Sequence, residues 1–346
     1  MSRLPLPLAV SVGCPSGIGP EVTVAAAATF PHPLMIVGDA AQIASIARAQ
    51  GVSLDRHAVL SSGALAARDR RPGKPTQAGG RAQLAWIDEA LDLVTSGRAR
   101  ALVTGPVSKE AIASSGAPGS SSFRGHTEHL QARLRAREVV MAFWSRELTS
   151  ALVTTHLPLA RVPAAIRPQN VASAAFWLGD LLHRLSPRRT ITLAIAGLNP
   201  HAGEHGLLGS EETSRIEPGM ALARTRLAAA GLPVTLVGPL GAESAFRLAQ
   251  AGSFDGVVAM YHDQATIPMK LLGFGEAVNI SLGLPVVRTS VDHGTGYDRA
   301  GKGTADARGM SEALALAHSL TSGQRATRMS GSAAPSSPRS ARKQRV

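Results

Sequence analysis

Three histidines in this chain stand where an apolar segment typical of a buried strand comes to its end. His156 closes ELTSALVTTH, His201 follows ITLAIAGLNP, and His262 closes GVVAMYH. The carboxyl ends of parallel strands meet at one edge of a sheet, and ligands bind there. Neutral imidazoles from separate strands can share one divalent ion and leave a coordination position open for water or substrate. The pattern indicates a catalytic metal site, with three unrelated structural histidines as the alternative.

Polar residues recur after the His262 strand. Lys270, Asn279 and Arg288 follow one another at intervals of nine residues, each inside or beside an apolar segment: PMKLLG, AVNISLG and PVVRTS. Charged groups in such surroundings usually have a partner. A lysine, an amide and the planar fork of an arginine together suit a bound phosphate or carboxylate. We therefore expect an anion site, or else a set of internal salt bridges.

Glycine and cysteine patterns exclude several classes of protein. The segment VGCPSGIGPE is a strand-turn-helix junction suited to placing a helix N-terminus near an anion, but GxGxxG occurs nowhere in the chain. GYDRAGKG fails as a P-loop because Gly303 stands where Ser or Thr should bind magnesium. The single cysteine, Cys14, excludes an intrachain disulfide framework and any multi-cysteine zinc site. GHTEH, with His126, differs from the zincin order HExxH.

The elements that must position these residues alternate almost from end to end. Strand-like segments such as PLMIVGD and RALVTGPV are each followed by a helical pattern, which predicts an α/β fold with a mostly parallel sheet. Glycine-rich and serine-rich segments near residues 120 and 290 suggest crossings between domains. We expect a first domain of residues 1–120 plus 290–321 and a second domain of residues 121–289.

The net charge of +12 is uneven along the 346 residues. Residues 322–346 hold six basic residues and no acid, and their Ser, Ala, Pro and Gly content predicts a disordered tail. Aromatic residues make up 3% of the chain, too few to favour stacking on nucleic-acid bases, so we do not expect a nucleic-acid partner. No apolar segment reaches bilayer length and no signal-peptide pattern is present, so a cytoplasmic protein is expected.

Several long segments together resemble one known family. VGCPSGIGPE, VTGPVSKEAI, GHTEHL, TTHLPL, AGLNPHAGEHGLLGSEE, YHDQATIPMK and VNISLGLPVVRTSVDHGT are similar, in order, to the 4-hydroxythreonine-4-phosphate dehydrogenases, NAD-dependent enzymes of pyridoxal phosphate biosynthesis. HGTGYDRAGKGTAD also resembles the cofactor loop of isopropylmalate and isocitrate dehydrogenases. The resemblance implies a two-domain isopropylmalate-dehydrogenase-like fold with the active site between the domains. This fold binds NAD without a GxGxxG Rossmann motif.

The resemblance also implies roles for individual residues. His156, His201 and His262 would bind one divalent ion (Zn, Mg or Co), and Asp263 would relay a proton or orient a histidine. The phosphorylated substrate would lie on His126, Thr127, Lys270, Asn279 and Arg288. NAD or NADP would lie on His293, Gly294, Gly301, Gly303 and Asp306. Family members are homodimers with the active site at the subunit interface, so one site could combine histidines from two chains.

The implied reaction oxidises 4-phosphooxy-L-threonine to a 3-oxo acid, which decarboxylates to 3-amino-2-oxopropyl phosphate. This chain departs from the family pattern at Cys14 and Ser16, where Asp and Ala are usual, and at Glu243, where Asp is usual. Another four-carbon acid phosphate, threonate or erythronate 4-phosphate, is therefore an alternative substrate. A three-histidine metallohydrolase is a further alternative.

Overall fold

The computed structural model describes residues 6–61, 63–187 and 189–322. Within these ranges no helix is both long and apolar enough to cross a membrane. The predicted basic tail, residues 322–346, lies outside the described residues except for Ser322, which ends the last helix.

The strands of the described residues form one 11-stranded sheet with the order β3-β2-β1-β4-β11-β10-β5-β6-β9-β7-β8. The strands are β1 Leu8–Ser11, β2 Leu34–Val37, β3 Ala58–Leu60, β4 Leu102–Thr104, β5 Val140–Trp144, β6 Thr149–Leu152, β7 Ile191–Ala196, β8 Val234–Leu240, β9 Gly256–Ala259, β10 Val278–Leu282 and β11 Arg288–Val291.

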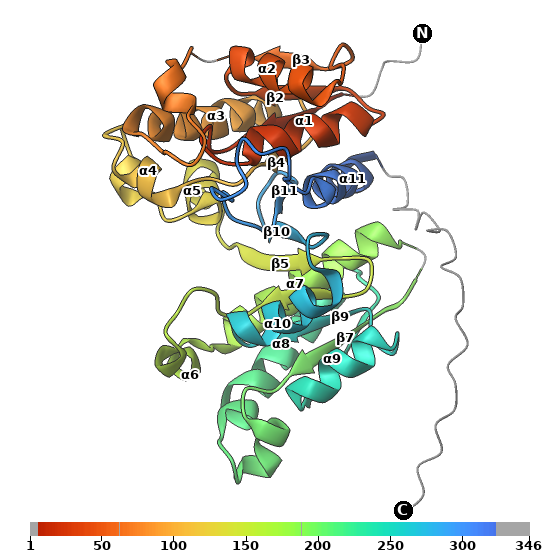
Figure 1. Ribbon diagram of the computed structural model, residues 1–346. Coiled ribbons are helices and arrows are strands. Elements are labelled where there is room, and N and C mark those ends of the chain that lie inside the picture. Colours follow the sequence, from red (N-terminus) through yellow and green to blue (C-terminus); the bar gives the residue numbers. More distant parts are fainter. Residues whose placement is uncertain (1–5, 62, 188, 323–346) are drawn as a thin grey trace, which may run out of the picture.

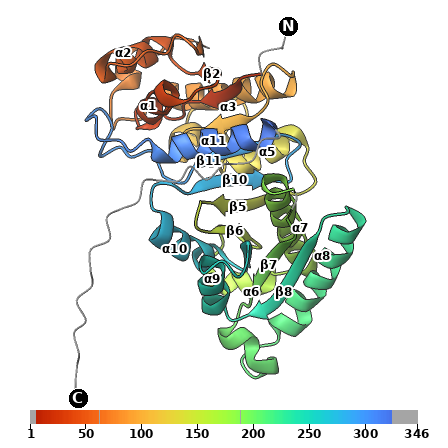
Figure 2. The same cartoon turned by 90° about the vertical axis from the view of Figure 1, so that its right-hand side faces the viewer.

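The helices cover both faces of this sheet. They are α1 Gly19–Thr29, α2 Ala40–Gln50, α3 Gln77–Thr95, α4 Lys109–Ala113, α5 His126–Leu134, α6 Val162–Ala165, α7 Pro168–Leu185, α8 Glu217–Ala229, α9 Ala242–Gln250, α10 His262–Gly273 and α11 Arg308–Ser322. Shorter turns are η1 Ala67–Arg70, η2 Ser120–Ser122, η3 Leu159–Arg161, η4 Pro200–Gly206 and the π-helical η5 Glu212–Ile216. Figure 2 shows α9 and α10 on one side of the lower strands and α7 and α8 on the other.

The predicted α/β class with a mostly parallel sheet is confirmed. The pairings at the centre of the sheet, β11 with β10, β10 with β5 and β5 with β6, are antiparallel. The remaining pairs are parallel. The segment EAVNISLGLPVVRTS accounts for one of the antiparallel pairings. It folds back on itself through Gly283, whose φ is 87°, and so supplies both β10 and β11.

Two halves of the molecule meet at these central strands (Figure 1). β10 pairs with β5 below and with β11 above, and β11 pairs in turn with β4. The main apolar core is continuous through both halves and contains Trp86 of α3 as well as Leu178 of α7. A smaller cluster, which includes Phe246 and Met269, lies under α9 and α10. The domain boundaries near residues 120 and 290 stay a prediction.

Candidate active site

The strands that carry the three histidines are neighbours in the sheet. β9 pairs in parallel with β6 on one side and with β7 on the other, so the carboxyl ends of all three lie along one edge. Two polar side chains tie these ends together. Thr154 Oγ1 donates to the carbonyl of Met260 at 2.7 Å, and Gln264 accepts from the Met260 amide at 2.6 Å while donating to the Gly197 carbonyl at 2.9 Å. We call this region the histidine edge.

His156 and His262 come together at this edge, with ring centroids 5.3 Å apart. The Nδ1–H of His262 donates to Asp263 at 2.6 Å, which leaves Nε2 as the nitrogen of that ring facing away from the carboxylate. Burial lowers the pKa of His156, and the nearby Lys109 ammonium lowers it further. Both effects favour the neutral imidazole, which is the form that binds metal ions.

His201 stands apart from these two rings. It is exposed, and it lies in η4, where residues 201–205 all have left-handed backbone angles. Among the described residues of one chain, no three His, Cys, Asp or Glu side chains form a group that could hold a metal ion. The structure therefore brings together two of the three candidate ligands, His156 and His262, and leaves His201 apart from them.

Arg288 is the centre of a second region, which we call the anion pocket. The guanidinium is 3% exposed and donates to Thr104 Oγ1 at 2.7 Å, Ser281 Oγ at 3.1 Å and Asn279 Oδ1 at 3.3 Å. Burial lowers its pKa to about 9, because removal from water penalises the charged form. Its Nε is buried and has no hydrogen-bond partner among the described residues. A buried cation with a free donor is suited to a bound anion.

His126 and Thr127 begin α5 beside this arginine. Thr127 Oγ1 lies 3.3 Å from Ser281 Oγ, which also accepts from Arg288. His126 Nε2 is buried without a partner in the described part of the chain. The pKa of His126 lies well below its usual range, first because of burial and then because of the positive charge of Arg288. The structure thus brings His126, Thr127, Asn279 and Arg288 together.

Lys270 is placed differently from the other predicted anion ligands. It is exposed near the end of α10, and it lies close enough to Asp292 to lower the pKa of that carboxyl group. Burial dominates and raises the pKa of Asp292, while Lys270, His262 and His293 act in the opposite direction. Asp292, the first residue of the predicted cofactor loop, is therefore within electrostatic reach of the histidine edge.

Sequence reasoning selected neither Asp292 nor two further charged residues of the site. Lys109, in the first turn of α4, has its Nζ 3.7 Å from the place a Cβ would occupy at Gly125, directly before His126. Its charge lowers the pKa of both His126 and His156. Glu128 approaches the same glycine and acts electrostatically on Arg288. VTGPVSKEAI and GHTEHL contain these two residues, but their approach to Gly125 depends on how the chain folds.

The predicted cofactor loop, residues 292–306, packs on the turn between β1 and α1. The Ile18 amide donates to the Thr295 carbonyl at 2.8 Å, and the Gly301 amide donates to Glu21 Oε1 at 2.6 Å. A Cβ on Gly17 would lie 2.5 Å from the Thr295 carbonyl oxygen, so only glycine fits there. His293 donates from Nδ1 to its neighbour Gly294, and its Nε2 is buried without a partner among the described residues.

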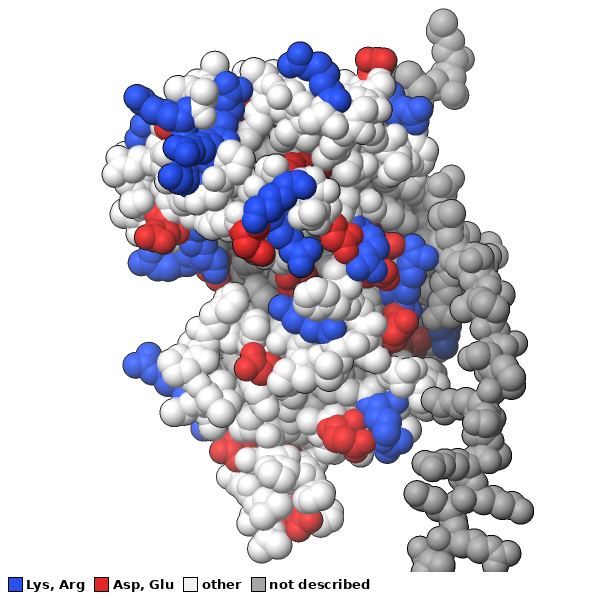
Figure 3. Space-filling view, viewed as in Figure 1, with Lys and Arg blue, Asp and Glu red and all other residues white. Residues whose placement is uncertain are grey.

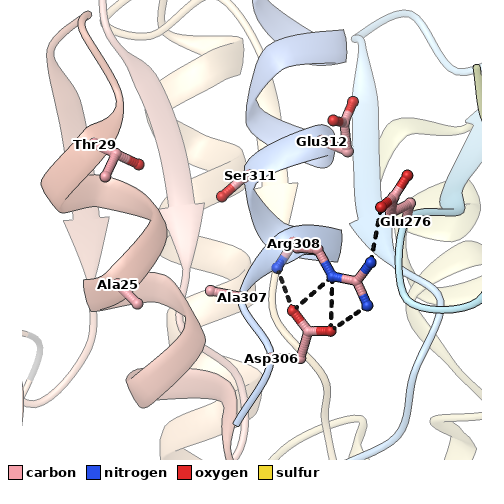
Figure 4. A pocket seen from close by; sticks show the side chains of 8 residues that line it. All are labelled: Ala25, Thr29, Glu276, Asp306, Ala307, Arg308, Ser311 and Glu312. Carbon is pink, nitrogen blue, oxygen red and sulfur yellow. Dashed lines mark hydrogen bonds and ion pairs between the residues drawn. The ribbon is translucent and has the colours of Figure 1, made fainter. Parts of the chain in front are cut away.

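Asp306, the last residue of this loop, lines a cavity of about 330 Å³ between α1 and α11. Its carboxylate forms a two-pronged pair with Arg308, whose guanidinium also reaches Glu276 at 2.8 Å (Figure 4). Arg308 lowers the pKa of Asp306. Gly303 is exposed and has a φ of 67°. The predicted cofactor residues therefore lie along one connected segment, although Asp306 already has a strong partner.

The departures from the family pattern have clear positions. Cys14 is buried, with Sγ 3.5 Å from the hydroxyl of Tyr297 in the cofactor loop, and burial raises the pKa of the thiol. Burial also raises the pKa of Tyr297, to about 12. Ser16 donates to the Lys74 carbonyl at 3.1 Å. Glu243 is exposed and accepts from Arg247 at 2.8 Å on its own helix.

Fold and site together define an α/β protein with imidazole donors at one strand edge and a buried arginine pocket nearby. On the face of the molecule that Figure 3 shows, acidic and basic side chains are interspersed. A hollow lies at its left margin, between the upper and lower parts. The chain belongs to the PdxA family, because the model described as "Pyridoxal phosphate biosynthetic protein PdxA" matches residues 21–317. The resemblance found in the sequence is thereby confirmed.

Relatives with known names agree with this assignment. The chain is 38% identical over 336 residues to the 4-hydroxythreonine-4-phosphate dehydrogenase of Desulfosudis oleivorans, with 92% of this chain and 96% of the relative covered. The crystal structure of the Klebsiella pneumoniae enzyme of that name superposes with a TM-score of 0.76 at 31% identity, covering 91% of this chain and 99% of the other. A terephthalate 1,2-cis-dihydrodiol dehydrogenase from Burkholderia xenovorans is also 31% identical, with a TM-score of 0.63, and the match covers 92% of this chain and 99% of the other.

Proposed function

We propose that this chain oxidises 4-phosphooxy-L-threonine with NAD or NADP and a divalent metal ion, and that the product then loses carbon dioxide. The chain is an oxidoreductase of pyridoxal phosphate biosynthesis, as its family and relatives are. The observation that carries the substrate assignment is the anion pocket. Arg288 Nε and His126 Nε2 are both buried without a partner in the described chain, beside the histidine edge. A phosphate oxygen would satisfy such donors.

Of the expected divalent ions, zinc and cobalt suit the imidazole ligands at the histidine edge better than magnesium, which prefers oxygen ligands. His156 and His262 present neutral imidazoles at neighbouring strand ends, and Asp263 orients the second ring through Nδ1. When bound, the metal ion would polarise the substrate hydroxyl and the nicotinamide would accept the hydride. The role of the protein is then to bind the phosphate through Arg288, Asn279, His126 and Thr127 and so hold the reacting carbon beside the histidines.

Proton movement is assigned to Asp263. Its carboxylate is exposed next to His262, so it can exchange protons with water as well as orient the ring. We assign Lys270 to the substrate phosphate and propose that the chain holds the cofactor along residues 292–306. The buried and unpaired Nε2 of His293 supports the cofactor assignment, because a polar ligand would satisfy it.

We further propose a homodimer in which His201 reaches the histidine edge of the partner subunit. η4 and η5 lie in the green segment at the lower end of Figure 1, away from the central strands. Large apolar side chains on the segments that follow the other two histidines are exposed, which is typical of a surface that another chain covers. They include Leu159 at 68%, Leu271 at 80% and Phe274 at 77% exposed.

Mixing two inactive variants tests the shared site. His201→Ala and His156→Ala should each be inactive alone. In a mixed dimer, one of the two sites would receive an intact His156, His262 and His201, so mixing should restore about a quarter of the original activity if subunits exchange freely. A mixture that exchanges subunits and stays inactive would contradict the shared site while leaving the reaction itself untouched.

The substrate assignment is tested with a panel. The metal-loaded protein is incubated with NAD and, separately, 4-phosphooxy-L-threonine, erythronate 4-phosphate and threonate 4-phosphate, and the absorbance of the reduced nicotinamide is followed. We expect the highest kcat/KM for 4-phosphooxy-L-threonine. A higher value for either sugar-acid phosphate would move the assignment to that substrate. Hydrolysis of a phosphate ester with no reduction of NAD would favour the metallohydrolase alternative.

A further inference from the structure

The segment that presents His201 has an unusual backbone. Residues 201–205 all have positive φ angles, between 42° and 79°, and only Gly203 among them is a glycine. L-amino acids adopt this left-handed conformation as single residues and rarely in succession, because Cβ then crowds the following carbonyl. A run of this kind persists only where its surroundings hold it, and such strain concentrates at functional sites.

Glu212 provides the main support for this turn. Its side chain is buried, with the residue 2% exposed. Oε1 accepts from the backbone amides of Leu198 and Asn199, each at 2.8 Å, and Oε2 accepts from Asn199 Nδ2 at 2.9 Å. These donors lie immediately before the left-handed residues, at the point where the chain leaves β7.

The fit between Glu212 and the turn is close on both sides. A Cβ at Gly203 would lie 2.7 Å from Oε2, and a Cβ at Gly197 would lie 3.1 Å from Oε1. Glu212 also begins the π-helical turn η5, a departure from α-helical geometry that often occurs at functional sites.

Among the described residues, Glu212 has no cationic partner. It forms no ion pair with any Lys or Arg in the part of the chain that the structure describes, although it is buried. Burying a carboxylate costs free energy unless hydrogen bonds compensate, and here three N–H donors of residues 198 and 199 provide the compensation. The carboxylate is therefore committed to the geometry of this turn.

We propose that Glu212 is a positioning residue: it holds the left-handed turn of residues 201–205 and thereby fixes where His201 is presented to the metal ion. The inference rests on the proposed function, in which His201 is a metal ligand. Glu212 itself touches neither substrate nor metal. Asn199 Nδ2 also donates to Glu211 Oε2 at 2.8 Å, so Glu211 belongs to the same hydrogen-bond network.

The test uses Glu212→Gln, which keeps the shape but sets an amide NH₂ against the N–H donors of residues 198 and 199. The control is Glu217→Gln, an exposed glutamate in the first turn of α8. Metal-free full-length protein is titrated with Co²⁺, and the visible spectrum of the bound ion reports its ligand geometry. We expect Glu212→Gln to weaken Co²⁺ binding by about 10- to 100-fold and to alter the spectrum. Glu217→Gln should bind Co²⁺ as the unsubstituted protein does.

A double-mutant cycle separates positioning from general destabilisation. If Glu212 acts through His201, adding Glu212→Gln to His201→Ala should cost no further Co²⁺ affinity. Amide hydrogen exchange, followed without metal, should become faster at residues 198–205 in Glu212→Gln and stay unchanged elsewhere. If Glu212→Gln fails to fold, Asn199→Ser, which keeps both backbone bonds to the carboxylate, should show the same changes to a smaller extent.

Three outcomes would overturn the inference. Unchanged Co²⁺ affinity in Glu212→Gln would remove it while leaving the proposed function intact. Additive losses with His201→Ala would assign Glu212 to overall stability instead. No Co²⁺ binding by the unsubstituted protein would overturn the metal site of the proposed function, and this inference with it.

Discussion

The anion pocket and the histidine edge are built in opposite ways. Arg288 is buried, and its guanidinium contacts Thr104, Ser281 and Asn279 within one chain. At the histidine edge, His201 is exposed and only His156 and His262 have adjacent rings. A pocket with its donors already fixed by burial can recognise an anion in the single chain. The histidine edge is open, so its geometry depends on what binds there: a metal ion and, as proposed, a second subunit.

The largest effect should come from breaking the histidine edge. His262→Ala removes one of the two adjacent imidazoles and the partner of Asp263, so we expect kcat to fall by at least about 10³-fold. Divalent-ion affinity should fall in parallel, while the melting temperature of the metal-free protein should change little. The absorbance of reduced nicotinamide and a metal titration measure the two quantities. Full activity in metal-free His262→Ala would refute the assignment.

Breaking the anion pocket should affect binding more than chemistry. Arg288→Ala removes the charge-assisted hydrogen bonds to the phosphate, so we expect KM for the phosphorylated substrate to rise by about 10- to 100-fold. Binding of NAD, measured by calorimetry, should be unchanged. Arg288→Lys keeps the charge but lacks the planar fork, and should recover only part of the loss. An equal loss of NAD affinity would argue against a dedicated phosphate pocket.

A substitution with a smaller expected effect tests whether the anion pocket and the histidine edge act on one substrate. Lys109 lies near both of them, because its charge lowers the pKa of His126 and of His156. Lys109→Met should raise KM by about threefold to fivefold, as expected for a cation that stays largely in water. Arg48→Met removes an exposed cation on α2, remote from the site, and serves as the matched control. Equal kinetics for both variants would exclude Lys109 from substrate binding.

The buried pocket should also leave a signature in the pH dependence of stability. His126 has a pKa well below 6.5, so below that pH the unfolded chain binds a proton that the native chain does not, and the native state loses stability as pH falls. Between pH 7.5 and 5.5 this histidine should account for a loss of at most about 1.4 kcal/mol, the limit for a ring that stays neutral in the native state. Urea unfolding at both pH values measures this loss. The free energy of unfolding of His126→Gln should fall less than that of the unsubstituted protein, by that amount. Identical losses in the two proteins would place His126 in contact with water.

Patterns along the chain predicted what depends on local sequence. Apolar segments ending at His156, His201 and His262 correctly placed these residues after three strands, and the structure adds that the strands are neighbours. The pairing of β5 with β10 at the centre of the sheet could not be predicted, because it forms only when segments more than 100 residues apart meet. The approach of Lys109 to His126 and the support that Glu212 gives to His201 were also missed, because both depend on how loops fold and leave no periodic signal in the sequence.

Local patterns also failed where the backbone leaves its usual conformations. Nothing in the pattern of NPHAGEHG indicates the five successive left-handed residues that it forms over a buried carboxylate. Lys270 shares the nine-residue spacing of Asn279 and Arg288 but lies exposed on a helix near Asp292, since the spacing continues across a change from helix to strand. The surroundings of each side chain in the fold, and not its spacing in the sequence, distinguish Lys270 from Asn279 and Arg288.

One measurement tests the central contrast most directly. Chelator-treated protein is titrated with 4-phosphooxy-L-threonine by calorimetry, and NAD reduction is followed before and after a divalent ion is added back. We expect the metal-free protein to bind the phosphorylated substrate through the anion pocket, and to reduce NAD only once the ion is restored. Undiminished NAD reduction by the metal-free protein, or no substrate binding without the ion, would contradict an anion pocket and a histidine edge with separate roles.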